Sequence, residues 1–348
     1  MRDIEIDNMK SIKLDDSEQI KMKSRITDSF GRSHSYLRIS LTDRCNLRCF
    51  YCMPENGVEL IEKPNIMTTE EIVTISRAFI GLGVDTIRLT GGEPLIRKDL
   101  DQLVRELTRL GVTLKMTTNG ILLDRYFDLF QEVGLKNINI SLDSLNKTKS
   151  VFITKRDYFE KILTNIQTAI DLQLNVKLNI VLIKGVNDSE IPDFVKLTRN
   201  KNIVVKFIEF MPFKGNHWDW RKGVSRDSIL HTVESHFGTI IPIPNPKNST
   251  SVNYKVNGYK GSFGIISTIT HPFCSDCNRI RLTADGKMKN CLFANTETDL
   301  LSPLRQGMPI EEIILKTINL KKYSRDGMVD TMEPNHYEHN RTMNSIGG

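Results

Sequence analysis

Short apolar runs alternate with amphipathic segments from about residue 36 to residue 237. Between the apolar runs, hydrophobic residues recur at helical spacing, as at Ile72, Ile75, Phe79 and Leu82. A strand and a helix that alternate at intervals of roughly thirty residues predict a parallel sheet with right-handed crossovers. Six strands are predicted: Tyr36–Ser40, Thr86–Thr90, Thr113–Thr117, Asn137–Ser141, Asn175–Ile183 and Val204–Phe210.

The six strand–helix units fit two α/β architectures. One is a partial (β/α)6 barrel with an open side, since six units are too few to close the usual eight-unit barrel. The other is a doubly wound flat sheet, which has the same rhythm along the chain. Periodicity does not separate these two folds.

The pattern changes after Phe237. Residues 240–256 are rich in Pro and Asn, and three short runs follow them: Gly261–Ile266, Arg279–Leu282 and Lys287–Lys289, the last two joined by a turn at 284–286. We therefore expect three regions: a polar lead-in over 1–33, a barrel over 34–237, and a small α+β layer over 238–348 that covers the open side. The last eight residues, 341–348, are expected to be too flexible to pack.

Composition narrows the class of protein. The chain has 348 residues, 39% of them hydrophobic, and a net charge of +6 from 48 basic and 42 acidic residues. This mild positive charge is compatible with an anionic metabolite and does not indicate nucleic acid. No apolar run of about 18 residues occurs, so no membrane span is expected. The first residues lack the features of a signal or transit peptide, which favours a cytoplasmic protein.

The first group of cysteines is Cys45, Cys49 and Cys52, spaced by three and then two residues. Three thiolates on one loop can hold three corners of a 4Fe-4S cluster and leave one iron open to a small molecule. A zinc site would need a fourth nearby ligand, and three unrelated buried cysteines are the other alternative. The spacing favours a cluster.

A second group comprises Cys274, Cys277 and Cys291. It again offers three thiolates, and the nearby His271 is more typical of a structural or solvent-facing residue than of a fourth ligand. A zinc ribbon remains the alternative, although a closed zinc site requires four ligands. We interpret this group as a second cluster with an open iron.

Motifs near the cysteines resemble those of known protein families. Tyr51 before the last cysteine of the first group and the Gly91–Pro94 turn after a predicted strand resemble the radical S-adenosylmethionine (SAM) superfamily. With the second cysteine group, the stretch 277–286 and the terminal Gly347–Gly348, the chain from about Tyr36 onward resembles the GTP 3′,8-cyclase family of molybdenum cofactor biosynthesis. The resemblance implies the partial barrel, two 4Fe-4S clusters and SAM.

The resemblance also implies a reaction. A 5′-deoxyadenosyl radical from SAM takes the 3′ hydrogen of GTP, and the C3′ radical attacks C8 to give 3′,8-cyclo-7,8-dihydro-GTP. The implied partners are GTP, a reducing electron donor and a downstream cyclic pyranopterin monophosphate synthase, without nucleic acid or membrane; a homodimer is an open possibility. Two rival classes are a peptide-modifying radical SAM enzyme with auxiliary clusters and an iron-sulfur electron carrier.

Roles follow residue by residue from the matched motifs. Arg279, Arg281, Gly347 and Gly348 would be catalytic, and Tyr51, Gly92, Ser141 and Met211 would contact SAM. GTP would be bound by Arg38, Arg88, Thr117, Lys177, Arg279, Ile280 and Arg281, and the six cysteines would hold the clusters. Alternatively, the strand cations could form ion pairs and Met211 could belong to the core. The chain departs from the family pattern at Thr86, where many members have Lys, and at Lys206, which is often Arg.

Overall fold

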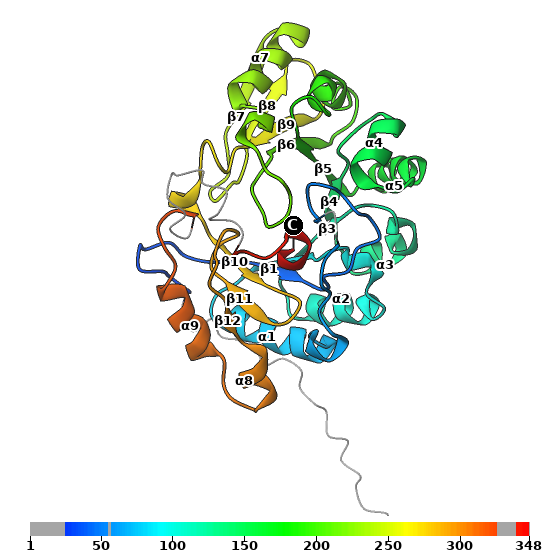
Figure 1. Cartoon of the computed structure of the whole chain (residues 1–348). Helices are drawn as coiled ribbons and strands as arrows, with labels where there is room; N and C mark the ends of the chain where they lie inside the picture. The colour runs from blue at the N-terminus through cyan, green and yellow to red at the C-terminus, as the bar shows by residue number, and fades with distance from the viewer. Residues whose placement is uncertain (1–24, 55–56, 326–338, 348) are drawn as a thin grey trace, which may run out of the picture.

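The computed structural model describes residues 25–54, 57–325 and 339–347 (Figure 1). Within them, twelve strands form one sheet in the order β12-β11-β10-β1-β2-β3-β4-β5-β6-β9-β8-β7. The outermost strands, β12 and β7, do not pair with each other, so the sheet is open. The predicted α/β class with a parallel centre is confirmed.

The centre of the sheet consists of the six predicted strands, which pair in parallel in chain order. They are β1 (Tyr36–Ser40), β2 (Thr86–Thr90), β3 (Thr113–Thr118), β4 (Asn137–Ser141), β5 (Asn175–Leu182) and β6 (Val204–Glu209). Two later strands extend the parallel part: β10 (Arg279–Leu282) lies beside β1, and β9 (Ser262–Ile266) lies beside β6.

Helices cover the outside of the parallel strands (Figure 1). These are α1 (Thr69–Gly81), α2 (Leu100–Arg109), α3 (Phe127–Glu132), α4 (Lys147–Thr154), α5 (Phe159–Asp171), α6 (Ile191–Lys196) and α7 (Arg226–Phe237). The start of α1 shows how the sequence sets a helix end. The Thr68 hydroxyl accepts a hydrogen bond from the Glu71 amide, and the Glu71 carboxylate accepts one from the Thr68 amide.

Two antiparallel additions lengthen the edges. β7 (Ile240–Ile243) and β8 (Val252–Val256) continue from β9, and β11 (Lys287–Lys289) and β12 (Thr298–Asp299) continue from β10. β7 and β8 lie in the Pro- and Asn-rich segment that the sequence left without strands. Pro242 is tolerated because β7 is the edge strand, where a missing amide donor leaves no ladder bond unmade.

The segment 267–278 connects the two ends of the parallel part, because it leaves β9 and enters β10. It therefore crosses the open side, as expected for the C-terminal region. Residues from β10, β6 and β9 (Arg279, Lys206 and Ile266) line one cavity. A flat sheet of this strand order would keep these residues apart, so the sheet curls into a partial barrel. The helices α8 (Leu301–Arg305) and α9 (Glu311–Asn319) follow.

The prediction of an unpacked C-terminus is wrong for the described residues. Met343–Ile346 form the short helix α10, and Ile346 is 1% exposed in a small apolar cluster with Phe213, Ile269 and Phe293. Burial of this apolar side chain contributes to ordering the segment, together with the hydrogen bonds of Asn344 and Gly347. Gly348 and residues 1–24 of the expected lead-in lie outside the described part.

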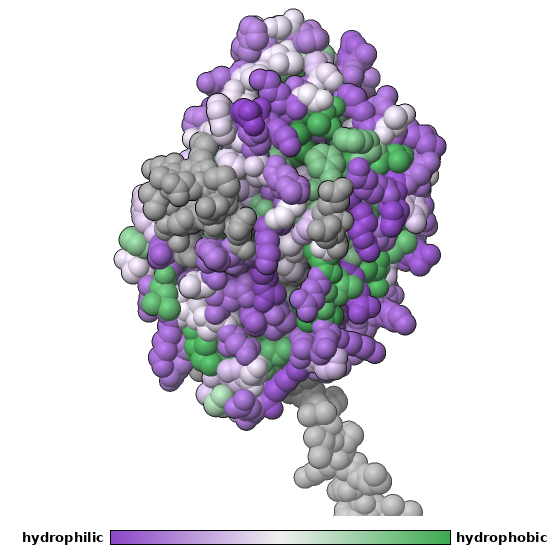
Figure 2. All heavy atoms as spheres, in the orientation of Figure 1, coloured by the Kyte–Doolittle hydropathy of each residue, from purple (hydrophilic) through white to green (hydrophobic). Residues whose placement is uncertain are grey.

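Polar residues dominate the face of the molecule shown in Figure 2, and its apolar residues form separate patches. Large exposed hydrophobic side chains such as Phe152, Trp220 and Leu320 come from different elements. Among the described residues, no helix has the length and apolar character needed to cross a bilayer.

A substitution of Phe207 in β6 tests how β9 packs against the barrel strands. The fully buried Phe207 ring contacts Phe194 of α6 and Phe263 of β9, with ring centroids 6.4 Å apart in both pairs. Phe207→Ala should lower the free energy of unfolding by about 3–5 kcal/mol, because it removes apolar contacts and leaves a cavity. Urea unfolding measures this, with Leu320→Ala at a 73% exposed site as the control. Equal losses in the two variants would contradict the packing described.

Candidate functional site

The first cysteine group lies on the loop that follows β1. The amides of Arg48 and Phe50 donate hydrogen bonds to the carbonyls of Thr154 and Ile153, at 2.9 and 3.1 Å. These contacts attach the loop to the end of α4. The Tyr51 hydroxyl donates to Oδ2 of Asp143 at 2.7 Å, which holds the predicted SAM-contacting ring against the strand β4 side of the barrel.

The Gly91–Pro94 turn packs directly on the cysteine loop. The Gly92 amide donates to the Thr42 carbonyl at 2.6 Å, and the Glu93 amide donates to the Arg44 carbonyl at 2.8 Å. A Cβ on Gly92 would lie 2.2 Å from the Arg44 oxygen. Glycine is therefore required here for the approach of the two loops, a reason that the sequence alone did not supply.

Glu93 ties this turn to β3. Its carboxylate accepts hydrogen bonds from the Leu95 amide, the Thr118 hydroxyl and the Asn119 amide. Burial outweighs these bonds and raises the pKa of Glu93 to about 7. Asn119 also reaches Cys45, with 3.8 Å between Nδ2 and Sγ. Neither residue was among the predicted site residues, although Glu93 stands within the quoted motif.

The thiols of the first group fit metal ligands. Burial, with a smaller contribution from the Glu93 charge, raises the pKa of Cys45 to about 11, and burial together with the neighbouring thiol of Cys45 raises that of Cys52 to about 12. Thiols in such surroundings become thiolates only when a cation offsets their charge. Ser141, the predicted SAM contact on β4, lies at the carboxyl end of its strand opposite Asn179.

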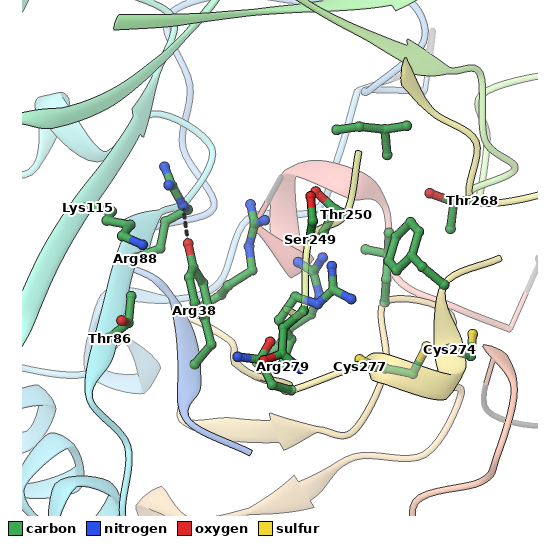
Figure 3. Close-up of a pocket in the computed structure, with 18 of the residues that line it drawn as sticks. Arg38, Thr86, Arg88, Lys115, Ser249, Thr250, Thr268, Cys274, Cys277 and Arg279 are labelled. Atoms are coloured by element: carbon green, nitrogen blue, oxygen red, sulfur yellow. Dashed lines mark hydrogen bonds between the residues drawn. The ribbon is translucent and has the colours of Figure 1, made fainter. Parts of the chain in front are cut away.

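A cavity of about 490 Å³ lies inside the curl of the sheet (Figure 3). Among the described residues that line it, nine are basic and one, Asp85, is a carboxylate. The basic residues are Arg38, Arg88, Lys115, Lys177, Lys206, Lys247, Arg279, Arg281 and Arg325. This excess of positive charge suits a ligand with several negative charges.

Strand register concentrates four of these cations in one row. Arg281 of β10 pairs with Arg38 of β1, Arg38 pairs with Arg88 of β2, and Arg88 pairs with Lys115 of β3. Adjacent strands are about 4.8 Å apart, so like charges in register repel one another. Lys115 was not predicted as a site residue. It lies one strand from Thr86, the position where many family members have Lys.

The row is not neutralised by carboxylates. In the described part of the chain, Arg38, Arg88 and Lys177 form no ion pair, so the ion-pair alternative does not hold for them. Arg88 instead donates to the Tyr36 hydroxyl, the Met116 carbonyl and the Thr117 hydroxyl, at 2.6, 2.8 and 3.2 Å. Nε of Arg38 is buried and has no hydrogen-bond partner.

Crowding of the cations lowers their pKa values. Burial and then the charge of Arg281 lower the pKa of Arg38. Burial and then the charges of Lys177, Arg88 and Lys115 lower the pKa of Lys206 to about 7. Its Nζ donates to the Ser251 hydroxyl at 2.9 Å, a neutral partner. The ligand-free cavity therefore holds charge that an anion would stabilise.

The second cysteine group forms part of the cavity wall (Figure 3). Arg32 donates to the Cys274 carbonyl at 2.7 Å, and Lys321 Nζ lies 3.7 Å from Cys277 Sγ. The Arg279 guanidinium lies 4.6 Å from the centre of the Phe273 ring. His271 is exposed, bonds to Thr270 and does not line the cavity.

In the ranges that the structure describes, no three His, Cys, Asp or Glu side chains are placed to hold one metal ion. Thiolates are the ligands of 4Fe-4S clusters, so the three cysteines of each group fit a cluster in ligand type.

The C-terminal segment lies between the two cysteine groups. The Gly347 carbonyl accepts a hydrogen bond from Arg281 at 2.7 Å, and the Asn344 side chain donates to the Asp43 carbonyl at 2.9 Å, beside the first loop. Met343 lines the cavity together with Met211. Gly347 has a φ of +86°, and a Cβ there would lie 2.5 Å from the Thr90 hydroxyl.

The predicted site residues thus divide into three groups. Arg38, Arg88, Lys177, Met211, Arg279, Arg281 and the second cysteine group line one cavity. Thr117 contacts Arg88 outside the lining, and Ile280 is fully buried in the core. Tyr51, Gly92, Ser141 and the first cysteine group lie outside the lining, while Gly348 is not described.

Two family models match the chain in succession. A family model described as Radical SAM superfamily matches residues 39–198, and one described as Molybdenum Cofactor Synthesis C matches residues 203–326. Together they span the barrel and the segment with the second cysteine group.

Two relatives have similar sequences over most of the chain. Molybdenum cofactor biosynthesis protein 1 of Homo sapiens is 48% identical over 309 residues, which are 87% of this chain and 49% of that protein. The chain thus spans about half the length of that relative. The protein named GTP 3′,8-cyclase, mitochondrial, of Arabidopsis thaliana is 45% identical over 340 residues, 95% of this chain and 86% of that protein. Because that name includes an organelle, the cytoplasmic location of this chain stays a prediction.

A solved structure supports the fold. The crystal structure of Streptococcus suis SuiB bound to S-adenosylmethionine superposes with a TM-score of 0.59 at 14% identity, covering 83% of this chain and 68% of that chain. At this identity the likeness concerns the fold alone. The sequence identity with the plant protein is the stronger finding, and by it the chain belongs to the GTP 3′,8-cyclase family of the radical SAM superfamily.

Proposed function

We propose that this chain is a GTP 3′,8-cyclase that converts GTP to 3′,8-cyclo-7,8-dihydro-GTP. The observation that carries the proposal is the cavity with nine basic lining residues and one carboxylate, bounded by Cys274, Cys277 and Cys291. A nucleoside triphosphate matches it, since the phosphates supply the missing negative charge and a base can face the cysteines. An electron carrier would have no use for such a cavity.

The row of cations would bind the triphosphate. Arg38 offers a buried, unpaired Nε, and Arg88 is already oriented by Tyr36 and Thr117. Guanidinium groups bind phosphate through paired hydrogen bonds, whereas Lys115, Lys177 and Lys206 act as point charges. These contacts would also fix the ribose relative to the first cysteine loop.

Two 4Fe-4S clusters are part of the proposal. Cys45, Cys49 and Cys52 would hold one, with SAM against Tyr51, Gly92, Ser141 and Met211, and Cys274, Cys277 and Cys291 would hold the other. When bound, this cluster and SAM would supply the radical chemistry at the ribose. The protein's own contribution is to hold C3′ and C8 of GTP near each other and to exclude water.

Arg281 and the C-terminal glycines would act where the base lies. Arg281 lines the cavity, is buried and donates to the Gly347 carbonyl. Its guanidinium can stabilise negative charge that develops on the nucleotide during reduction. A reducing electron donor and a synthase that consumes the product complete the proposed sequence of reactions.

Anaerobic incubation with SAM, a reductant and GTP tests the function directly. We expect 5′-deoxyadenosine and a cyclised nucleotide from GTP and not from ATP or CTP, identified by mass. Cys45→Ala should lower 5′-deoxyadenosine formation at least a hundredfold, because it removes a proposed cluster ligand. Undiminished SAM cleavage by this variant would contradict the assignment of the first cysteine group.

The double change Arg279→Ala and Arg281→Ala tests the substrate site. Each arginine is expected to contribute about 1.5–3 kcal/mol through charged hydrogen bonds, so cyclisation should fall by at least two orders of magnitude. Iron and sulfide content should stay unchanged, since neither arginine is a proposed ligand. Normal turnover by the double variant would refute the proposed binding mode.

Lys206 should make GTP binding dependent on pH. Its pKa of about 7 in the ligand-free protein means that the lysine loses its charge as pH rises from 6 to 8. GTP affinity should therefore fall over this range, and binding at pH 8 should take up a proton. Calorimetry in buffers with different ionisation enthalpies measures both effects.

The matched control is Lys206→Arg, which introduces the residue often found in the family. Arginine stays charged throughout this range, so the variant should lose most of the pH dependence. The ionisation of the γ-phosphate affects both proteins equally and cancels in the comparison. Identical pH profiles would show that Lys206 does not titrate on binding.

A further inference from the structure

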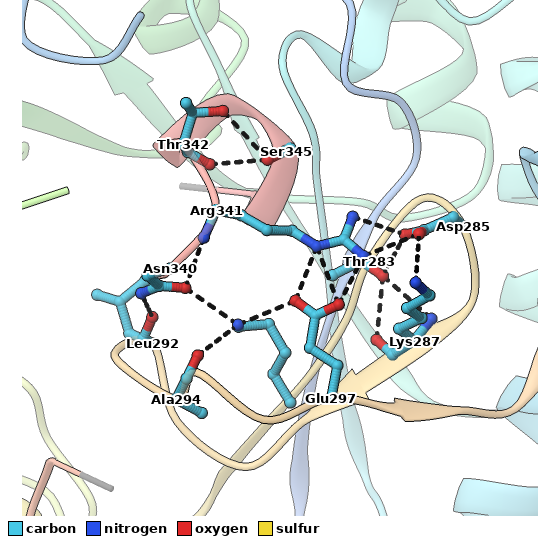
Figure 4. A network of polar contacts seen from close by, with 11 residues as sticks. Thr283, Asp285, Lys287, Leu292, Ala294, Glu297, Asn340, Arg341, Thr342 and Ser345 are labelled. Atoms are coloured by element: carbon cyan, nitrogen blue, oxygen red, sulfur yellow. Dashed lines mark hydrogen bonds and ion pairs between the residues drawn. The ribbon is translucent and has the colours of Figure 1, made fainter. Parts of the chain in front are cut away.

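A polar network fixes the start of the C-terminal segment to the rest of the protein (Figure 4). Its centre is the Arg341 guanidinium, which donates to both oxygens of Glu297 and both oxygens of Asp285, at 2.6 to 3.0 Å. Two carboxylates placed in this way engage four of the five N–H donors of the guanidinium: one on Nε, one on Nη1 and two on Nη2. Arg341 is therefore held in one orientation.

The network is well shielded from water. The exposed fractions of the Arg341, Asp285 and Glu297 side chains are 21%, 14% and 15%. Burial would raise the pKa of Asp285 and of Glu297, yet the hydrogen bonds from Arg341 keep both below their ordinary values. Both carboxylates are thus ionised at neutral pH, and the pairing is ionic.

Lys289 joins a second residue of the segment to the same network. It is 1% exposed, and its Nζ donates to the Ala294 carbonyl, to Glu297 and to Oδ1 of Asn340, at 2.6, 3.0 and 3.1 Å. Asn340 in turn donates to the Leu292 carbonyl at 3.1 Å. Asn340 and Arg341 are therefore attached next to Cys291.

The far end of the segment contacts the same hairpin. Asp285 lies in the turn between β10 and β11, and Arg281, which bonds to the Gly347 carbonyl, lies in β10. The short helix α10 fills the interval and buries Ile346. The C-terminal segment is thus attached to the β10–β11 hairpin at two points, through Arg341 at Asp285 and through Gly347 at Arg281. These two attachments fix the position of Gly347 relative to Arg281.

We propose that Arg341, Asp285, Glu297, Lys289 and Asn340 form a tail latch that positions Gly347 at Arg281 for the cyclisation. Arg341 is a positioning residue, since it does not line the cavity and acts through the segment that it anchors. The inference deepens the proposed function and rests on it where turnover is concerned. The ordering of the segment itself is independent of the reaction.

Hydrogen exchange of the full chain without substrate tests the latch. In Arg341→Met, the amides of residues 345–347, which bond to Thr342 and Met343, should exchange at least tenfold faster than in the unaltered chain. Lys287→Met is the matched control, because Lys287 lies 3.7 Å from the same Asp285 and makes no contact with the tail. Its exchange should stay within twofold of the unaltered chain.

Turnover provides the second readout. Arg341→Met should lose at least tenfold in cyclised product while its cysteine groups still assemble iron and sulfide, and Arg341→Lys should recover part of the loss because it keeps one charge. Lys287→Met should turn over normally. Unchanged exchange in Arg341→Met, or faster exchange with full cyclisation, would overturn the latch.

The two proposals fail in different ways. If exchange responds as expected but the unaltered chain makes no cyclised nucleotide, the latch stands as a structural device and the proposed function fails. Should Arg341→Met unfold, Glu297→Gln removes one of the two carboxylates and leaves the guanidinium paired with Asp285. Exchange in that variant should still rise at least threefold, and no change would overturn the latch.

Discussion

The barrel holds a row of buried positive charges that form no ion pair with a carboxylate in the part of the chain that the structure describes. Arg281, Arg38, Arg88 and Lys115 stand side by side on four adjacent strands, and burial of such a row is costly. The lowered pKa values of Arg38 and Lys206 express this cost. The buried cations lower the free energy of unfolding, so the apolar core must offset this loss. An anionic ligand would raise the free energy of unfolding again when it binds.

Much of the scaffold could be predicted from the sequence because it is local. Hydrophobic periodicity gave the six central strands, and turn residues gave the hairpin of β10 and β11. The pairing of β10 with β1 and of β9 with β6 could not be predicted, since nothing in a short apolar run specifies a partner that is distant in the sequence, as Arg279 is from Tyr36 and Ser262 from Val204. The β10–β1 pairing adds Arg281 to the row of cations, whereas the β1–β2 and β2–β3 registers align Arg38, Arg88 and Lys115.

The C-terminal segment is a second case in which contacts between distant residues could not be predicted from the sequence. Its last residues have no period and many small polar side chains, a pattern typical of an unpacked end. Its order comes from distant residues, namely the ring of Phe293 under Ile346 and carboxylates 44 and 56 positions from Arg341. A residue's own neighbours in the sequence carry no information about such contacts.

Cys45 of the first cysteine group and Cys277 of the second have opposite electrostatic surroundings. Burial is reinforced by the charge of Glu93 at Cys45, and the pKa of this thiol rises to about 11. At Cys277 burial is outweighed by the charges of Arg279 and Lys321, and the pKa falls to about 7, whereas burial raises the pKa of Cys291 in the same group. Negative charge is therefore easier to place on Cys277 than on Cys45. The same cations beside Cys277 favour an anionic ligand on this side of the cavity, and the buried carboxyl of Glu93 beside Cys45 does not.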